Sequence, residues 1–147
     1  MSDTIGSILD KKGREIWSIS PEATVYDAIA LMAEKRVGAL LVTSGSRLAG
    51  IVSERDYARK VILQGRSSKD TRVGEIMTAD LVTVSPGETV EECMRIMTRA
   101  RIRHLPVMEG KALMGVVSIG DLVKAVIADQ AHTIQQLHTY IGGEYPA

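Results

Sequence analysis

The apolar and polar positions of this chain follow the same order twice, and each copy predicts the same short elements. In the first copy, apolar runs at 16–19, 39–42 and 48–52 predict three strands, and a Gly-containing turn joins the last two as a hairpin. Between the first two strands, apolar residues recur with the period of one helical face, at Val25, Ala28, Ile29, Met32 and Ala33. With a helix after the hairpin, the predicted unit is β-α-β-β-α.

A shift of 65 positions superimposes the second copy on the first without a gap, so strands are predicted again at 81–84, 104–107 and 113–117. The matched residues include Ser20-Pro21 with Ser85-Pro86, Met32 with Met97, Gly45 with Gly110, and Gly50 with Gly115. A shorter match, at a shift of 68, joins 5–8 to 73–76. The chain is therefore predicted to be a tandem duplication.

The helices of both copies have predictable starts. Thr24 and Thr89 each precede an acidic residue by three positions, which is the spacing of a capping box and predicts an N-cap. The helix after the hairpin is predicted to begin near Asp56 or Asp121. Its inward-facing residues are predicted to be Val61 and Ile62 in the first copy, and Val126 and Ile127 in the second.

These elements divide the chain into a first repeat at 5–63, a linker at 64–72 and a second repeat at 73–127, with an additional C-terminal helix and tail at 128–147. The linker is polar and has no apolar period. One repeat of roughly 50 residues is too small to be stable alone, so we expect the two to pack together. The predicted fold class is α/β, of the α+β type, built from two β-α-β-β-α repeats.

Composition narrows the function. Aromatic residues make up 3% of the chain and Phe is absent, so the core is predicted to be aliphatic and a stacking platform for single-stranded nucleic acid is not expected. The 18 Lys and Arg residues balance 18 Asp and Glu residues, which leaves no overall field to attract nucleic acid or an anionic membrane. A single cysteine, Cys93, excludes an internal disulfide and is predicted to lie in the core. His132 and His138 are six residues apart, a spacing that does not place them on one face of a helix, so no metal site is predicted. The start of the sequence has no basic residues followed by an apolar run, so a cytoplasmic protein is expected.

The segments Gly50–Asp56 and Gly115–Asp121 read GIVSERD and GVVSIGD, each with a hydroxyl and a carboxylate three residues apart where a strand meets a helix. Unpaired N–H groups and the helix dipole favour phosphate at such a helix N-terminus, and a carboxylate in the first turn can accept from both hydroxyls of a ribose. The same spacing is also that of a capping box, in which the aspartate only satisfies the serine amide. Both interpretations are open at this point.

The two repeats, the ALLV and HLPV second strands and the paired Gly-to-Asp segments together resemble the tandem cystathionine-β-synthase-type (CBS) domain pair, also called a Bateman module. The resemblance spans nearly the whole chain. It implies that the repeats pack about a pseudo-twofold axis. It also implies two ligand clefts, each taking its serine and aspartate from one repeat and its base-binding strands from the other.

The resemblance implies site residues as follows. One cleft would be formed by Ser53, Glu54, Arg55, Asp56, Thr78, the Val82 backbone, Ile102 and Arg103. The other would be formed by Ser118, Ile119, Asp121, the Trp17 backbone, Val37, Gly38 and Ala39. In these clefts aspartate would hold ribose, serine the phosphate, and the aliphatic side chains the adenine. Arg103 and His104 replace Gly38-Ala39 in the second copy and are candidate phosphate contacts, whereas Asp10 in place of Thr78 makes the clefts unequal.

The function expected from this reasoning is that of a regulatory module that binds an adenine nucleotide, AMP, ATP or NAD(H), and signals through a change of conformation. The alternative is a structural dimerisation adaptor with empty clefts. Catalysis is not expected, because no nucleophile with a base, metal cluster or Gly-rich phosphate loop is readable, and no catalytic cofactor is expected. A homodimer and an unidentified regulated protein are the expected partners.

Overall fold

The chain forms two units that do not follow the order of the sequence. The computed structural model describes residues 3–141. One unit comprises Glu15–Val82, and the other comprises the described residues within Met1–Arg14 and Thr83–Ala147. We name them after their equivalent helices, as the α2 unit (α2, Val25–Lys35) and the α5 unit (α5, Val90–Ala100).

The α2 unit contains a three-stranded sheet. Its strands are β1 (Ser18–Ile19), β2 (Ala39–Ser44) and β3 (Arg47–Ser53), in the order β1-β2-β3, with β1 parallel and β3 antiparallel to β2. Besides α2, its helices are α3 (Glu54–Tyr57), the π-helical turn η1 (Ala58–Ile62) and α4 (Val73–Ile76). The hairpin predicted at 39–42 and 48–52 is confirmed, and both strands are slightly longer than predicted.

The α5 unit repeats this arrangement with a smaller sheet. It contains α1 (Ile5–Lys12), α5, the antiparallel strands β4 (His104–Glu109) and β5 (Ala112–Ser118), and α6 (Ile119–Ile141). The strand predicted at 81–84 was wrong in extent, because only Val84 pairs, as a parallel bridge to Val107. In the α2 unit the amide of Leu41 donates to Trp17, but its equivalent is Pro106, which has no N–H to donate.

Helices α1 and α4, which were not predicted as helices, are exchanged between the repeats. The amide of Gly6 in α1 donates to the carbonyl of Pro86 at 2.8 Å, and the amide of Gly74 in α4 donates to the carbonyl of Pro21 at 2.9 Å. The first helix of each sequence repeat therefore docks on the Ser-Pro turn of the other repeat. The predicted boundaries at 63 and 73 describe the sequence duplication, whereas the compact units divide after Arg14 and after Val82.

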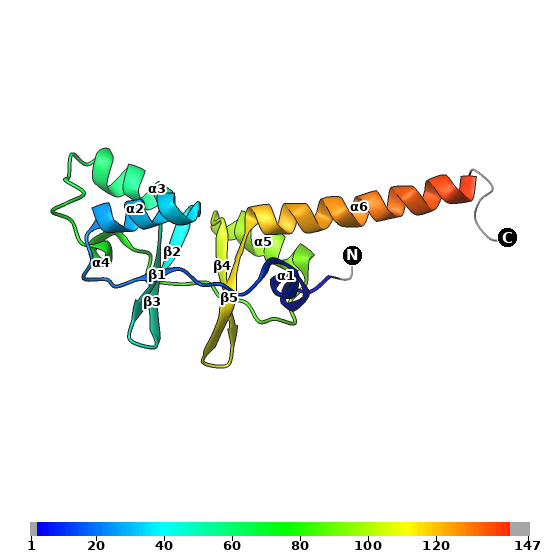
Figure 1. The fold of residues 1–147 in the computed structure, drawn as a ribbon, viewed down its shortest axis with the longest axis horizontal. Coiled ribbons are helices and arrows are strands. Elements are labelled where there is room, and N and C mark those ends of the chain that lie inside the picture. Colours follow the sequence, from blue (N-terminus) through cyan, green and yellow to red (C-terminus); the bar gives the residue numbers. More distant parts are fainter. Residues whose placement is uncertain (1–2, 142–147) are drawn as a thin grey trace. The chain divides into compact units, whose positions relative to one another are not determined.

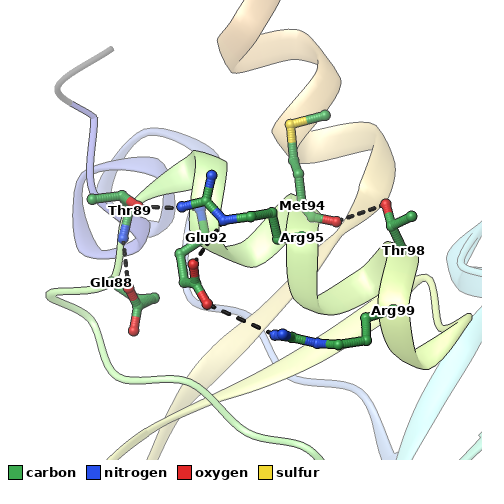
Figure 2. A network of polar contacts seen from close by, with 7 residues as sticks. All are labelled: Glu88, Thr89, Glu92, Met94, Arg95, Thr98 and Arg99. Carbon is green, nitrogen blue, oxygen red and sulfur yellow. Dashed lines mark hydrogen bonds and ion pairs between the residues drawn. The ribbon is translucent and has the colours of Figure 1, made fainter.

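The predicted N-caps of α2 and α5 are confirmed. Oγ1 of Thr24 accepts from the amide of Asp27 at 3.1 Å, and Oγ1 of Thr89 accepts from the amide of Glu92 at 3.2 Å. At α5 the capping box is only half formed, because the Glu92 carboxylate pairs with Arg95 and Arg99 farther along the helix (Figure 2). The amide of Thr89 bonds instead to the carboxylate of Glu88 (Figure 2).

The helices after the hairpins begin at Glu54 and Ile119, two residues earlier than predicted. Val61 is buried, but the prediction that Ile62 and Ile127 face inward was wrong, because they are 55% and 59% exposed. Consecutive helical residues point about 100° apart, so a narrow core-facing stripe takes only one of each pair. Helix α6 runs without a break from Ile119 to Ile141, so the predicted additional helix continues the second helix of the repeat (Figure 1).

Each unit has its own aliphatic core, with equivalent positions filled in both. The α2 unit buries Val25, Ala28, Met32, Leu40, Val42, Val52, Val61, Val73 and Ile76. The α5 unit buries Ile5, Ile8, Leu9, Val84, Val90, Cys93, Met97, Leu105, Val107, Val117 and Leu122. The predicted core position of Cys93 is confirmed, and burial raises the pKa of its thiol to about 11. Among residues 3–141, no helix combines the length and apolar character that a membrane span requires.

The glycine that opens each Gly-to-Asp segment allows close packing of the exchanged segments. A Cβ at Gly50 would lie 2.7 Å from the backbone oxygen of Thr78 and 2.9 Å from the sulfur of Met77. A Cβ at Gly115 would lie 2.9 Å from Cδ2 of Leu9, the end of a side chain. The same glycine therefore faces rigid backbone in one unit and a movable side chain in the other.

We expect Gly50→Ala to destabilise the protein by about 1 to 3 kcal/mol, the usual cost of overpacking, because the Thr78 backbone must shift. Gly115→Ala is expected to cost less, since Leu9 can change its rotamer. Urea denaturation of both variants gives the free energy of unfolding. Gly87→Ala, where a Cβ meets nothing within 4 Å, is the control. Equal costs at Gly50 and Gly115 would contradict this account of the two contacts.

Candidate functional site

The two Ser-x-x-Asp segments occupy equivalent junctions between a strand and a helix. In the α2 unit, Ser53 pairs with Ala39 across the hairpin, and the amide of Glu54 donates to the carbonyl of Gly38 at 3.0 Å. In the α5 unit, Ser118 pairs with His104, and the amide of Ile119 donates to the carbonyl of Arg103 at 2.8 Å. Each junction thus joins the head of a helix to the start of the neighbouring strand of the same repeat.

Both aspartates form a capping box with their serines, which is one of the two interpretations that the sequence allowed. Oδ2 of Asp56 accepts from the amide of Ser53 at 2.9 Å, and Oδ2 of Asp121 accepts from the amide of Ser118 at 2.8 Å. In return, each serine hydroxyl accepts from the amide of its aspartate at 3.2 Å. A carboxylate offers about four acceptor positions, so this capping does not exhaust either side chain.

Two lysines that sequence reasoning missed complete these junctions. Nζ of Lys60 lies 3.0 Å from Oδ1 of Asp56, and Nζ of Lys12 lies 2.7 Å from Oδ2 of Asp121. The aspartate side chains are only 13% and 16% exposed. The Asp56–Lys60 pair has the i,i+4 spacing that stabilises helices, so the sequence held a signal for it. Lys12 is 109 residues from Asp121 and carried no such signal.

The charges at Asp121 and His104 are coupled. Burial alone would raise the pKa of Asp121, but hydrogen bonds from Lys12 and from the Ser118 amide hold it below its ordinary value. Burial lowers the pKa of His104; Asp121 partly offsets this, and the charges of Lys12 and Arg103 lower it further. At neutral pH the aspartate is therefore ionised and the histidine is uncharged.

Basic residues gather at the α5-unit junction. His104 and Arg103 lie there together with Lys12, whereas the equivalent positions in the α2 unit hold Ala39 and Gly38. Within its unit Arg103 thus neighbours the segment that begins at Ser118. The clefts predicted from the sequence place Arg103 and Ile102 beside Ser53, and Gly38 beside Ser118. Each of these pairings joins residues of different units and stays a prediction.

The remaining predicted site residues have structural contacts of their own. The backbone carbonyl of Trp17 accepts from Leu41, and the backbone of Thr78 both donates to and accepts from Ile51. Val37 packs against the core of the α2 unit, and Ile102 and Ile119 pack against that of the α5 unit.

The other predicted site residues are at least partly exposed. Val82 is 40% exposed and Arg55 is half-buried. Asp10, which stands in place of Thr78, pairs with Arg14 at 2.9 Å.

No group of three or more His, Cys, Asp or Glu residues that could hold a metal ion is found in the part of the chain that the structure describes. The side chains of His132 and His138 lie outside the described residues.

Comparison with known proteins gives a consistent family. The model of the CBS domain matches residues 6–62 and 73–128, which are the two repeats. The mitochondrial CBS domain-containing protein CBSX3 of Arabidopsis thaliana is 46% identical, with 98% of this chain and 74% of the relative covered. The CBS domain-containing protein YhcV of Bacillus subtilis is 33% identical, with 80% and 84% covered.

Solved structures agree with these relatives. A CBS-domain protein from Burkholderia ambifaria is 58% identical with a TM-score of 0.84, covering 86% of this chain and 96% of that one. A CBS-domain containing protein from Agrobacterium tumefaciens is 36% identical with a TM-score of 0.80, covering 83% and 98%. The resemblance and the α/β fold class inferred from sequence are therefore confirmed, and the chain belongs to the CBS domain family as a tandem pair of repeats.

Proposed function

We propose that this chain is a non-catalytic regulatory module that binds an adenine nucleotide, AMP, ATP or NAD(H), at its Ser-x-x-Asp segments. CBS domain pairs are a family of regulatory modules that bind adenosine ligands. The observation that carries the proposal is the duplicated serine and aspartate at the head of a helix, with Arg103 and His104 beside the second copy. Such a group offers acceptors for a sugar and cations for a phosphate within one small region.

The residue types suggest the roles. Asp56 and Asp121 would accept hydrogen bonds from the ribose hydroxyls, and Ser53 and Ser118 would donate to phosphate. The aliphatic side chains of Val37, Ile102 and Ile119 would contact the adenine. A CBS domain pair of the same fold, MJ0100, was crystallised in complex with 5′-methylthioadenosine and S-adenosyl-L-methionine; it is 19% identical with a TM-score of 0.78. That protein supports the adenosyl class of ligand, and the cations of this chain favour a member that carries phosphate.

Signalling would follow from unequal affinity of the ligand for two arrangements of the repeats. We also propose that the chain forms a homodimer, which in turn contacts a regulated protein not yet identified. Exposed apolar residues on α6, Val123, Ile127 and Ile134, support an interface there. A cytoplasmic setting is part of the proposal, although one relative is named as mitochondrial.

A second candidate function is a structural dimerisation adaptor that binds no ligand. The internal bonds of both aspartates favour it, because a serine amide and a lysine already bind each carboxylate. A thermal shift assay separates the two functions. A ligand at 100 times its dissociation constant adds about 2.7 kcal/mol to stability, so one of AMP, ATP or NAD(H) should raise the Tm by several degrees. If AMP, ATP, NAD(H) and S-adenosylmethionine all leave the Tm unchanged, the proposed nucleotide binding fails.

The ribose assignment predicts that Asp121→Asn or Asp56→Asn weakens nucleotide binding about 10- to 100-fold, the cost of losing a hydrogen bond to a charged group. Isothermal titration calorimetry measures the change. Asp27→Asn is the matched control, because Asp27 follows its N-cap Thr24 by the same three residues but lies outside the motif. Unchanged affinity in both motif variants would refute the assignment.

The lowered pKa of His104 predicts a loss of stability in mild acid. Because the unfolded chain takes up the proton near the ordinary pKa of 6.5 and the folded protein only at a lower pH, stability is present above that value and falls as the pH drops below it. We expect the Tm of the wild type to fall more steeply between about pH 7 and pH 5 than that of His104→Gln. A bound nucleotide phosphate should favour the charged imidazole and reduce the difference. Parallel Tm profiles with and without AMP would contradict this role of His104.

A further inference from the structure

Each motif aspartate is held by a lysine that is also attached to the last turn of a short helix. Lys12, whose Nζ lies 2.7 Å from Oδ2 of Asp121, is itself the last residue of α1. Lys60, whose Nζ lies 3.0 Å from Oδ1 of Asp56, donates from the same atom to the carbonyl of Ile76 at 2.8 Å. Ile76 is the last residue of α4. In both units an ammonium group therefore joins the carboxylate to the C-terminal end of a short helix.

These helix ends lie just before the chain passes from one unit to the other. Helix α1 ends at Lys12, and the chain enters the α2 unit after Arg14. Helix α4 ends at Ile76, and the chain enters the α5 unit after Val82. A change in the last turn of α1 or α4 therefore acts on a segment that connects the units.

The two links are built from unrelated sequence positions. At the shift of 65, Lys60 corresponds to Ala125, and at the shift of 68, Lys12 corresponds to Asp80. In the α5 unit the helix end supplies the ammonium, whereas in the α2 unit it supplies a carbonyl that accepts from the ammonium. Because neither lysine has a lysine at its equivalent position, copying one repeat does not explain both links between an aspartate and a helix end.

A ribose would use the same carboxylate oxygens as these lysines. Oδ2 of Asp121 already accepts from the Ser118 amide and from Lys12, and the side chain is 16% exposed. The Asp56 side chain is 13% exposed and is bonded through both oxygens, Oδ2 to Ser53 and Oδ1 to Lys60. Because so little of either carboxylate is exposed, we expect a diol that reaches it to compete with the ammonium group for the same small surface.

We propose that a bound adenine nucleotide displaces Lys12 from Asp121 and Lys60 from Asp56, and that this displacement releases the last turns of α1 and α4. This inference rests on the proposed function and gives it a route of signalling. The two lysines are positioning residues that report occupancy of the motif to the segments connecting the units.

Charge favours a ligand with phosphate in this exchange. When Lys12 leaves Asp121, Arg103 remains at this junction, where its charge and that of Asp121 both act on His104. A phosphate can accept hydrogen bonds from the Arg103 guanidinium, whereas the sugar and base of adenosine carry no charge that pairs with it. AMP should therefore displace Lys12 more readily than adenosine does.

Amide hydrogen exchange gives a direct readout at the two helix ends. The amide of Gly13 donates to Leu9 at 2.9 Å and closes the last turn of α1; the amide of Met77 donates to Val73 at 2.9 Å and closes that of α4. Saturating AMP should speed exchange at Gly13 and Met77 by about two- to fivefold, the range expected from the loss of one ion pair. Adenosine, which carries the same ribose, should have the same effect at Gly13 at equal occupancy but should need a higher concentration to reach that occupancy.

Lys12→Met, made in the Asp56→Asn background so that only the second motif is read, should bind AMP about two- to fivefold more tightly because the competitor is gone. It should also exchange the Gly13 amide faster without AMP and show no further acceleration with it. Lys11→Met, one position earlier on an exposed part of α1, is the control and should change neither quantity. Lys12→Arg should have the opposite effect on affinity, since a guanidinium holds a carboxylate through two N–H groups.

The outcomes separate the two levels of the proposal. If the wild type binds none of AMP, ATP or NAD(H) in calorimetry, the proposed function and the displacement both fail. If AMP binds and Asp121→Asn weakens it, but Lys12→Met leaves affinity and Gly13 exchange unchanged, only the displacement fails. Weaker AMP binding by Lys12→Met would also overturn it, because the ammonium would then be a contact of the ligand and not its competitor.

Discussion

The exchange of α1 and α4 between the repeats is the constraint on which the rest of the structure depends. Backbone bonds from Gly6 to Pro86 and from Gly74 to Pro21 hold these helices, and a Cβ at either glycine would lie 3.2 Å from the accepting oxygen. The exchange completes each hydrophobic core with side chains from the other repeat. It also brings Lys12 within reach of Asp121, so the electrostatics of the second motif follow from the path of the chain.

Elements set by local sequence were predictable, and elements set by distant partners were not. The apolar period of α2 and α5 and the hairpin alternation are properties of neighbouring residues, so their positions followed from the sequence. Helices α1 and α4 are eight and four residues long, and backbone groups of the other repeat hold their starts. The match of 5–8 to 73–76 marked them but did not say where they dock. The shortened strand at Val84 depended on the missing N–H of Pro106 in its partner.

The same distinction applies to the candidate site. The position of each Ser-x-x-Asp segment and its capping geometry follow from a three-residue spacing, and Lys60 was readable from its i,i+4 relation to Asp56. The pairing of Lys12 with Asp121 depends on the exchange of α1 between the repeats, so no sequence pattern indicated it. Capping and nucleotide binding also cease to be exclusive alternatives, because a carboxylate can satisfy a serine amide while its remaining acceptor positions change partner.

The Ser-Pro docking of the short helices has a consequence for any ancestor of this chain. A polypeptide ending in the linker at 64–72 would carry α1 but not the turn at Ser85-Pro86 on which α1 docks, and its own turn at Ser20-Pro21 would have no helix. Two identical molecules of that kind could complete one another if the leading helix of each docked on the Ser-Pro turn of the other. If a protein of one repeat kept this exchange, it would dimerise through swapped segments, and fusion of its two copies into one chain would make that association permanent.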